Sequence, residues 1–185
     1  MTVLPSSAIR PYPSQYTTSF VTKNSETIRL RPIRPDDECK IRDFHQGLSE
    51  QSVYSRYLKP FNLSERTTHA RLTRMCFIDY DREIAIVALS QNSESGSIVA
   101  VARLKKNFSK TQGELSVIVV DALQRQGLGL ELIKRLLHVA KDESLEAVTA
   151  FLLPDNTAMR VVLEKLGFSF SNHNGGLIAV RRLRD

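Results

Sequence analysis

Gln124-Arg125-Gln126-Gly127-Leu128-Gly129 lies between a strand-like run and a helix-like run, and this arrangement is the most informative pattern in the sequence. Residues 115–120 before it are an apolar run typical of a strand, and apolar residues recur at helical spacing over residues 133–140. A strand, a glycine-containing turn and a helix start together form an anion site. The glycines let the backbone approach a phosphate closely, and the first amides of the helix point at it.

The spacing of the two glycines excludes two common phosphate loops. No Gly-Lys-Ser/Thr follows Gly127, as a P-loop requires, and the third glycine of a dinucleotide fingerprint is absent. Taken alone, a Gly-x-Gly pair is also compatible with a tight strand-to-helix connection that binds nothing.

Composition is that of one soluble domain long enough to bury a sizeable core, at 185 residues. No run of about 18 apolar residues occurs, so we expect no membrane span, and the N-terminus lacks the regions of a signal peptide. Cys39 and Cys76 are far apart and lack metal-ligand spacing. Two unpaired cysteines indicate a reducing, cytoplasmic location.

The formal net charge of +6 suits an anionic ligand, and it also suits nucleic acid. The basic residues are scattered, however, and zinc spacing, RNP motifs and basic heptads are missing. We therefore expect no nucleic-acid partner and no membrane partner. The four histidines show no metal spacing, so we also expect no metal; they are His45, His69, His138 and His173.

Residues 1–25 are rich in Pro, Ser and Thr and have no apolar period, which predicts a flexible extension or linker remnant before a domain at 26–185. Residues 27–33 alternate and predict the first strand. Helices are expected at 35–48, at 49–58 and from an N-cap at Ser64 to Ile78.

The second half of the chain alternates strands and helices. Strands are expected at 83–89, 98–104 and 114–120, and the first of these is apolar on both faces, which favours a central position. A long helix should end near Ser144, followed by a strand at 147–153, a helix at 156–166 and two closing strands around a turn at 174–176. The pattern predicts an α/β fold with a central mixed, twisted sheet of about six to seven strands flanked by helices.

Two segments carry a resemblance to a known superfamily. Gln-x-x-Gly-x-Gly after a valine-rich strand resembles the coenzyme A pyrophosphate loop of the GNAT N-acetyltransferases. Residues 153–159 with 163–168 resemble the late strand–Asn–helix–Gly-Phe element of that family, in the expected order and separation. The resemblance implies a GNAT fold over residues 27–183 and acetyl-CoA as the acyl donor.

Earlier segments narrow the resemblance to the Pat-type bacterial protein lysine acetyltransferases. They are residues 9–13, 30–38, 44–49, 52–57 and 78–83. In much of that group the acetyltransferase domain follows a large acyl-CoA-synthetase-like region, and the Arg-Pro-Tyr-Pro segment resembles the linker between them. This chain contains neither a synthetase-like nor a cyclic-nucleotide-binding region, so it is either a stand-alone version or an excised domain.

The resemblance also implies which residues hold the cofactor. The pyrophosphate would lie on the backbone of Gln124, Arg125, Gln126, Gly127, Leu128 and Gly129. Backbone groups of Val117, Ile118 and Val119 would bind the pantetheine and polarise the thioester. The side chain of Asn156 would hydrogen-bond the pantetheine arm, whereas its plain alternative is an N-cap of the last long helix.

Glu114 is the candidate general base. It stands at the start of the fourth strand, and Gly113-Glu114-Leu115-Ser116 occupies the place of the Pat-type Ala-Glu-Phe-Ala, whose acid acts as the base. Apolar neighbours would raise its pKa toward neutrality. A merely solvated strand residue is the alternative. Many GNAT enzymes protonate the thiolate with a tyrosine in the last helix, but Leu163 stands at that place.

Three functions remain open on the sequence. The first is acetyl-CoA-dependent acetylation of protein lysine side chains, such as those of acetyl-CoA synthetase, by direct transfer with Glu114 as base. The second is N-acetylation of a small-molecule amine. The third is a non-catalytic acyl-CoA-binding regulatory module, against which the acid at position 114 argues. Acceptor pockets lie in variable loops, so the sequence separates the first two only by resemblance.

Overall fold

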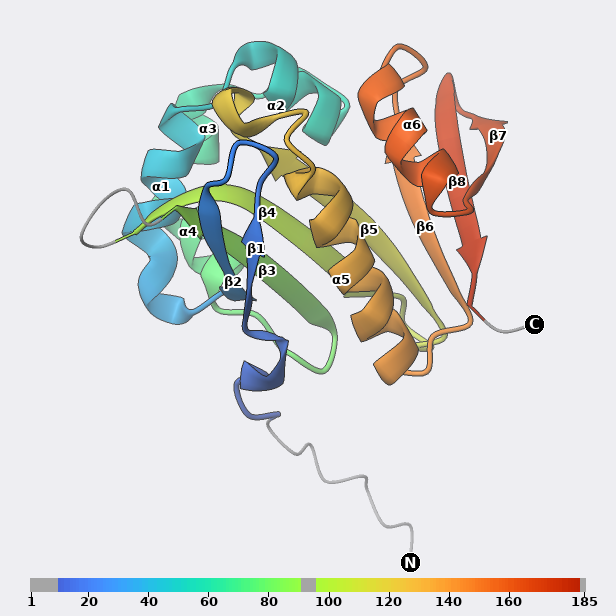
Figure 1. The fold of residues 1–185 in the computed structure, drawn as a ribbon, viewed down its shortest axis with the longest axis horizontal. Coiled ribbons are helices and arrows are strands. Elements are labelled where there is room, and N and C mark those ends of the chain that lie inside the picture. The colour runs from blue at the N-terminus through green and yellow to red at the C-terminus, as the bar shows by residue number, and fades with distance from the viewer. Residues whose placement is uncertain (1–9, 91–95, 184–185) are drawn as a thin grey trace, which may run out of the picture.

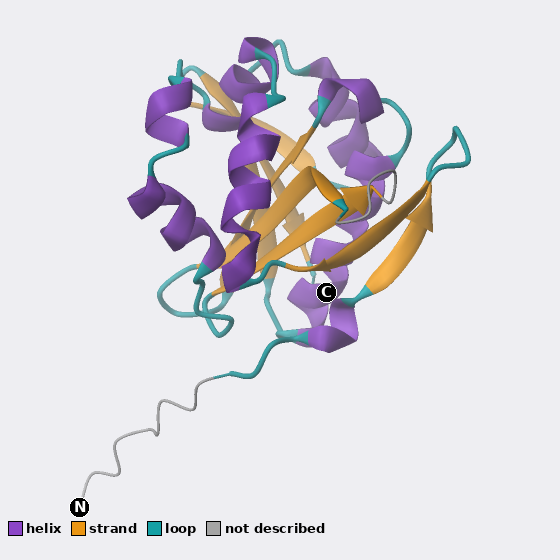
Figure 2. Ribbon diagram, turned by 90° about the vertical axis from the view of Figure 1, so that its left-hand side faces the viewer, coloured by secondary structure: helices purple, strands orange, loops and turns teal. Residues whose placement is uncertain are grey.

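The computed structural model describes residues 10–90 and 96–183 and contains one mixed sheet with helices packed on both faces (Figure 1, Figure 2). The order of its eight strands is β1-β2-β3-β4-β5-β6-β8-β7. Neighbouring strands are antiparallel except β5 and β6, which are parallel. The strands are β1 Thr18–Val21, β2 Thr27–Pro32, β3 Glu83–Ser90, β4 Ser97–Lys106, β5 Gln112–Val119, β6 Ala147–Leu152, β7 Ser169–His173 and β8 Gly176–Arg182.

The helices follow the predicted order with one correction. They are η1 Ser14–Tyr16, η2 Pro35–Asp37, α1 Glu38–Gln46, α2 Glu50–Tyr57, α3 Leu63–Arg66, α4 His69–Cys76, η3 Asp121–Leu123, α5 Leu128–Asp142 and α6 Thr157–Lys165. The prediction of a single helix from Ser64 to Ile78 is wrong, because the helix is interrupted at residues 67–68 between α3 and α4. The hydroxyl groups of Thr67 and Thr68 donate to the backbone oxygens of Leu63 and Glu65, which offers the backbone an alternative to a continuous helix.

The expected mixed α/β sheet is confirmed, with eight strands in place of six to seven. The additional strand is β1, which pairs with β2 from Thr18 opposite Leu30 to Val21 opposite Thr27. Its side chains alternate between half-buried and exposed, so no fully buried face marks it in the sequence. The segment expected to be an extension therefore contains a strand, and residues 1–9 of it lie outside the described residues.

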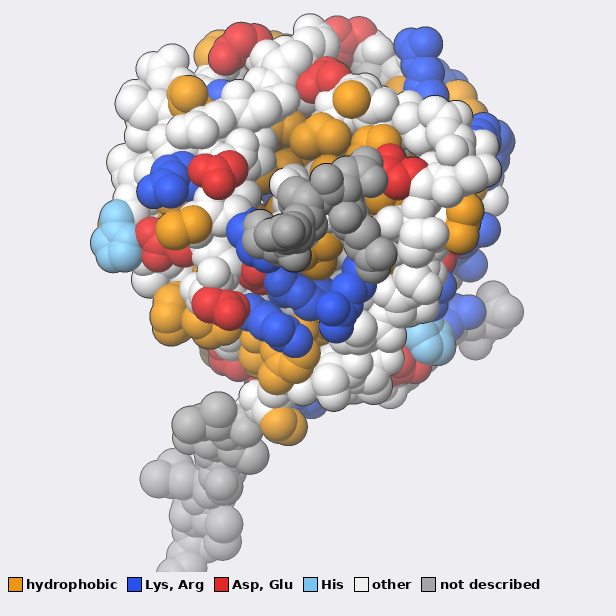
Figure 3. All heavy atoms as spheres, turned by 60° about the vertical axis from the view of Figure 1, so that its left-hand side comes forward, with side chains coloured by type: hydrophobic (Ala, Val, Ile, Leu, Met, Phe, Trp, Pro, Cys, Tyr) orange, Lys and Arg blue, Asp and Glu red, His pale blue; other side chains and the backbone are white. Residues whose placement is uncertain are grey.

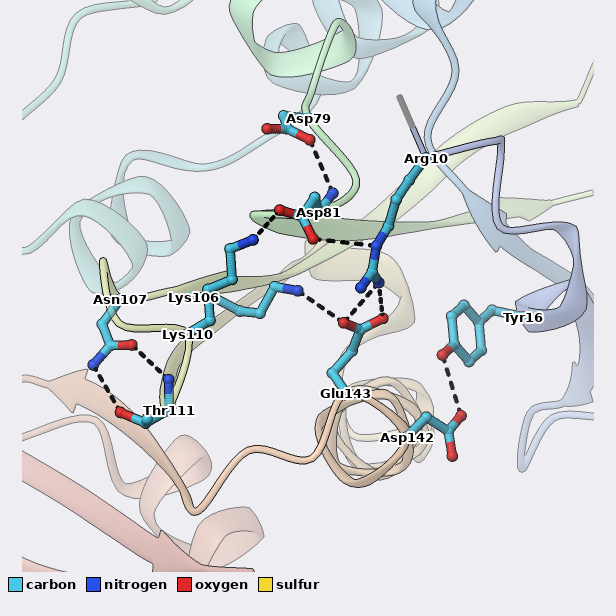
Figure 4. Close-up of polar contacts among 10 residues, drawn as sticks. All are labelled: Arg10, Tyr16, Asp79, Asp81, Lys106, Asn107, Lys110, Thr111, Asp142 and Glu143. Carbon is cyan, nitrogen blue, oxygen red and sulfur yellow. Dashed lines mark hydrogen bonds and ion pairs between the residues drawn. The ribbon is translucent and has the colours of Figure 1, made fainter. Parts of the chain in front are cut away.

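Polar contacts also attach the chain before β1 to the domain (Figure 4). The Arg10 guanidinium pairs with Asp81 at 3.2 Å and with Glu143 at 2.6 Å, and Lys106 Nζ lies 2.8 Å from the same Glu143 carboxylate. The Tyr16 hydroxyl donates to Asp142 at the end of α5 at 3.1 Å. Burial and the Asp142 carboxylate raise the pKa of Tyr16 to about 12. These contacts hold residues 10–16 against α5 and the turn that precedes β3.

The core has one layer on each face of the sheet. On one face α5 and α6 pack on buried residues that include Ile84, Ile86, Leu115 and Val148. On the other face α1, α2 and α4 pack on a second cluster, which includes Val87 and Ile118. Strand β3 is buried on both faces and lies between β2 and β4, as its apolar sequence predicted.

The surface mixes charges of both signs. On the face drawn in Figure 3, basic side chains gather below the centre and acidic side chains lie beside them. Among the described residues, every helix is too short or too polar to cross a membrane. Cys76 is buried, Cys39 is exposed, and neither is in a disulfide.

Candidate active site

The candidate site lies where the sheet splits, because β5 and β6 diverge along their length (Figure 1). The two strands pair only from Gln112 opposite Ala147 to Glu114 opposite Thr149. Beyond that point they separate, and a cavity of about 740 Å³ opens along residues 115–119 of β5, with residues 155–159 at the start of α6 on its other side. The backbone edge of β5 that faces the cavity is therefore available to a ligand.

The glycine loop closes one end of this cleft. Arg125 and Gly127 both have left-handed backbone conformations, with φ of 62° and 90°, and α5 begins at Leu128. A Cβ added to Gly129 would contact only Val119, at 3.9 Å, so space remains over the first turn of the helix. A left-handed arginine is strained, and such strain is typical of ligand-binding loops. Space and free helix amides fit a pyrophosphate at the predicted loop.

Both glutamines of the loop support it from within the protein. Gln124 Nε2 donates to the Ser52 hydroxyl at 2.9 Å and to the Val119 carbonyl at 3.1 Å. Gln126 Nε2 donates to the Ala122 carbonyl at 3.0 Å. The side-chain amides thus hold the loop in shape, and the binding surface is left to the backbone.

Asp121 joins the loop to α2, a contact that the sequence did not reveal. Its carboxylate accepts hydrogen bonds from the hydroxyl groups of Ser49 and Ser52, at 2.7 and 2.9 Å, and from the Ser49 amide at 3.2 Å. Burial opposes ionisation, but these hydrogen bonds prevail and lower the pKa of Asp121. Ser49 itself caps α2. These hydrogen bonds therefore fix the start of α2 to the end of the cleft that the glycine loop forms.

The β1–β2 hairpin supplies a cation that the sequence did not single out. The Lys23 amide donates to the Gln126 carbonyl at 3.2 Å, and Lys23 lines the cleft together with Arg125 and Lys165. Three basic residues from three segments thus line the cleft, and their positive charge suits a polyanionic ligand. The N-terminal segment gave no sign of this role, because it has no apolar period.

Asn156 and β5 line the middle of the cleft. The Asn156 Oδ1 atom accepts the Met159 amide at 3.1 Å, so the side chain caps α6, and the residue also lines the cavity. Val117 and Val119 are half-buried beside the cavity, whereas the Ile118 side chain belongs to the core cluster on the face covered by α1, α2 and α4. The structure thus brings the predicted loop, strand and asparagine together around one space.

Glu114 lies where β5 and β6 stop pairing. Its partners across the ladder are Lys105 and Thr149, and the residue is exposed. The neighbours in the sheet are thus polar, unlike the apolar surroundings expected from the sequence. Gly113 before it is required by packing, since an added Cβ would lie 2.6 Å from Leu104. Gly113 thus faces the side of the sheet covered by α5, and Glu114, the next residue of the strand, faces the side covered by α2.

The expectations for the family's tyrosine position and for a metal site concern residues that do not line the cleft. Leu163, at the place of the family's tyrosine, is fully buried in the core. The residues that line the cleft include neither histidine nor cysteine. Within residues 10–90 and 96–183, no group of three or more acidic, histidine or cysteine side chains is placed to hold a metal ion.

A glycine loop at a helix start, beside an open strand edge in a split sheet, is the arrangement expected of a protein that binds an acyl-coenzyme A. The acetyltransferase (GNAT) domain model matches residues 27–169, and the chain belongs to the GNAT acetyltransferase family. It is an enzyme of the N-acetyltransferase class, and members of this family use acetyl-CoA.

Two curated relatives agree with this assignment. An acetyltransferase of Pseudomonas aeruginosa is 28% identical over 141 residues, covering 76% of this chain and 74% of the relative. Acetyltransferase Pat of Mycolicibacterium smegmatis is 26% identical over 171 residues, covering 92% of this chain and 48% of Pat. The chain therefore spans about half the length of Pat.

A solved structure has the same fold. The GNAT domain of S. lividans PAT matches with a TM-score of 0.84 at 22% identity, covering 94% of this chain and 100% of that domain. This match covers a larger share of the chain than the family model, which begins after β1 and ends at residue 169.

Proposed function

We propose that this chain transfers the acetyl group of acetyl-CoA directly to lysine side chains of proteins, with Glu114 as the general base. The observation that carries the proposal is the position of Glu114 at the apex of the split between β5 and β6, where the open edge of β5 begins. Resemblance to the Pat-type enzymes and the similarity to Pat of M. smegmatis support a protein lysine as acceptor. Two unpaired cysteines fit a cytoplasmic enzyme.

The cleft supports an extended cofactor. The loop amides and the α5 start hold the pyrophosphate at one end, with Lys23, Arg125 and Lys165 around it. The pantetheine lies along the edge of β5, where backbone groups of residues 117–119 bind it and Asn156 contacts it from α6. This path directs the thioester toward the Glu114 end of the strand.

The reaction needs no covalent enzyme intermediate. Glu114 takes one proton from the lysine ammonium, directly or through a water, and the neutral amine attacks the thioester carbonyl. Backbone amides of β5 stabilise the oxyanion. The carbon–sulfur bond then breaks, and the nitrogen loses its second proton to solvent as the amide forms. Coenzyme A leaves as a thiolate that takes a proton from solvent, because Leu163 offers none.

Glu114→Gln tests this assignment. We expect acetyl-CoA binding to be retained and kcat to fall by about 10²–10⁴-fold, the range of a positioned base. The deficit should shrink from pH 6 to pH 9, because more of the acceptor amine is then neutral without help. Glu146→Gln is the matched control, since Glu146 is an exposed acid just before β6.

Thiol release from acetyl-CoA, measured with acetyl-CoA synthetase and with a panel of small amines, gives the readout. Equal rates for wild type and Glu114→Gln across this pH range would reject Glu114 as the base. Faster turnover of small amines than of the protein would favour the small-molecule alternative, and no release with any acceptor would favour a regulatory acyl-CoA-binding module.

A further inference from the structure

Arg56 is a cation in the cleft without an anionic partner. It lies near the end of α2, is half-buried and lines the cavity. Within the described part of the chain its guanidinium makes no hydrogen bond or ion pair, and its close contact is the face of the Tyr57 ring, 5.0 Å from the ring centroid. Burial lowers the pKa of Arg56, and the nearby Arg103 adds to this, while Tyr57 and Glu114 oppose it.

Two neighbouring arginines, Arg103 and Arg66, are compensated within the protein, whereas Arg71 lies over the Tyr57 and Phe61 rings. Arg103 pairs with Glu83 and donates to the Met75 carbonyl at 2.6 Å. Arg66 donates to the His45 carbonyl at 3.3 Å. A desolvated charge is costly unless an opposite charge or hydrogen bonds compensate it. Since Arg56 borders the cavity, the missing anion can be supplied by a ligand.

The position of Arg56 says which part of a ligand this is. Ser52 is bonded to Asp121 and Gln124 at the glycine-loop end of the cleft, and Arg56 follows it by one helical turn, about 6 Å along α2. Helix α2 packs against β5, and Arg56 lines the cavity together with Leu115 and Ser116, the residues that follow Glu114. The influence of the Glu114 charge on Arg56 agrees with a position near the Glu114 end of the cleft. In the proposed binding mode the glycine loop holds the pyrophosphate of coenzyme A, and Arg56 lies on the thioester side of that loop. The anion at Arg56 therefore belongs to the reacting end.

We propose that Arg56 binds a carboxylate on the acceptor, so that the enzyme selects a lysine flanked by an acidic residue. The inference rests on the proposed acetylation of protein lysines. A guanidinium forks two parallel hydrogen bonds onto a carboxylate, which gives both strength and orientation. That contact would hold the lysine backbone beside the cleft while its amine reaches Glu114. A carboxylate on the acyl group of the donor is the other source of the same chemistry.

The first experiment measures binding without turnover. Protein saturated with free coenzyme A is titrated calorimetrically with two blocked peptides, one containing Asp-Lys and the other Asn-Lys. Wild type should bind the Asp peptide roughly 10–100-fold more tightly, the usual size of a charge-assisted hydrogen-bonded pair. Arg56→Gln should abolish the difference, and Arg56→Lys should retain part of it. Arg74→Gln, at an exposed position of α4, is the matched control.

The second experiment compares kcat/KM for acetylation of the same two peptides. The preference for Asp-Lys should follow the binding preference in each variant. Equal affinity of wild type for the two peptides, or an unchanged preference in Arg56→Gln, would overturn the proposal. Absence of acetylation with both peptides would refute the proposed function alone, because the calorimetric result does not depend on turnover.

Two further measurements separate the remaining explanations. Succinyl-CoA and acetyl-CoA are compared as ligands of wild type and Arg56→Gln. A preference for succinyl-CoA that the substitution removes would assign the carboxylate to the donor and overturn the acceptor assignment. Thermal unfolding of Arg56→Gln should match or exceed that of wild type, because an uncompensated cation is lost. A lowered Tm would instead indicate a structural role and count against the proposal.

Discussion

His45 makes the stability of this fold sensitive to acid. Its side chain lies in α1 with an exposed fraction of 1%, and neither ring nitrogen makes a hydrogen bond within the described residues. Burial lowers its pKa from 6.5 to about 4, and the surrounding arginines at positions 56, 66, 71 and 103 add to the effect. The folded protein therefore holds the imidazole neutral under conditions in which the unfolded chain protonates it.

The sign and size of the effect follow from proton linkage. Above pH 6.5 the imidazole is neutral in both states, and its contribution to stability is fully present. As the pH falls from 6.5 toward 4, the unfolded state binds a proton that the folded state refuses, so the free energy of unfolding decreases. The difference between a pKa of 6.5 and one of about 4, at 1.36 kcal/mol per pKa unit, corresponds to about 3 kcal/mol of stability, most of it lost by pH 4.5.

His45→Leu removes this titration while keeping a side chain of similar size. Urea unfolding followed by circular dichroism at pH 7.5, 6.5, 5.5 and 4.5 gives the free energy of unfolding for both proteins. Carboxylates lower the stability of both in acid, so the decisive quantity is the difference between the two curves. That difference should shift in favour of His45→Leu by about 2–3 kcal/mol between pH 7.5 and 4.5.

His69→Gln is the control, because the His69 side chain is 83% exposed. Its curve should lack the large shift expected for His45→Leu. Parallel curves for wild type and His45→Leu over this pH range would refute the reasoning, since they would mean that His45 protonates equally well in the folded and unfolded states.

Two further predictions concern the cofactor. Gly127→Ala places a side chain at φ 90°, which costs about 1–2 kcal/mol of stability. It should also raise the Kd for acetyl-CoA, measured by calorimetry, roughly tenfold or more. The control Gly175→Ala, at φ 79° in the β7–β8 turn, should cost similar stability and leave the Kd unchanged. Equal affinities of the two variants for acetyl-CoA would show that the glycine loop is not part of the cofactor site. Asn156→Ala should lose about 1 kcal/mol of stability as a cap and about 0.5–1.5 kcal/mol of acetyl-CoA affinity, whereas Asn156→Ser should keep the cap and lose only affinity. If Asn156→Ser binds acetyl-CoA as wild type does, the residue is a cap alone.

Several strands and helices could be predicted from the sequence because the apolar spacing that marks each one lies within that element. The strand before residue 124, the helix after it and the doubly buried β3 each follow from apolar spacing within one element. Asn156 was predicted for the same reason, because a cap acts within its own helix. The break at Thr67 and Thr68 was missed, since hydroxyl groups compete with helical hydrogen bonds without altering the apolar period.

Local patterns in the sequence were enough to predict the strand–glycine loop–helix unit, the order of most strands and the resemblance to GNAT acetyltransferases. Three features emerged only from the folded structure: the pairing of β1 with the sheet, the contacts of Lys23 and Asp121 at the glycine-loop end of the cleft, and the uncompensated Arg56 in the cleft. Apolar periodicity reports whether one element has a buried face. The contacts of a single charged side chain depend on elements distant in the chain, and these meet only when the sheet assembles.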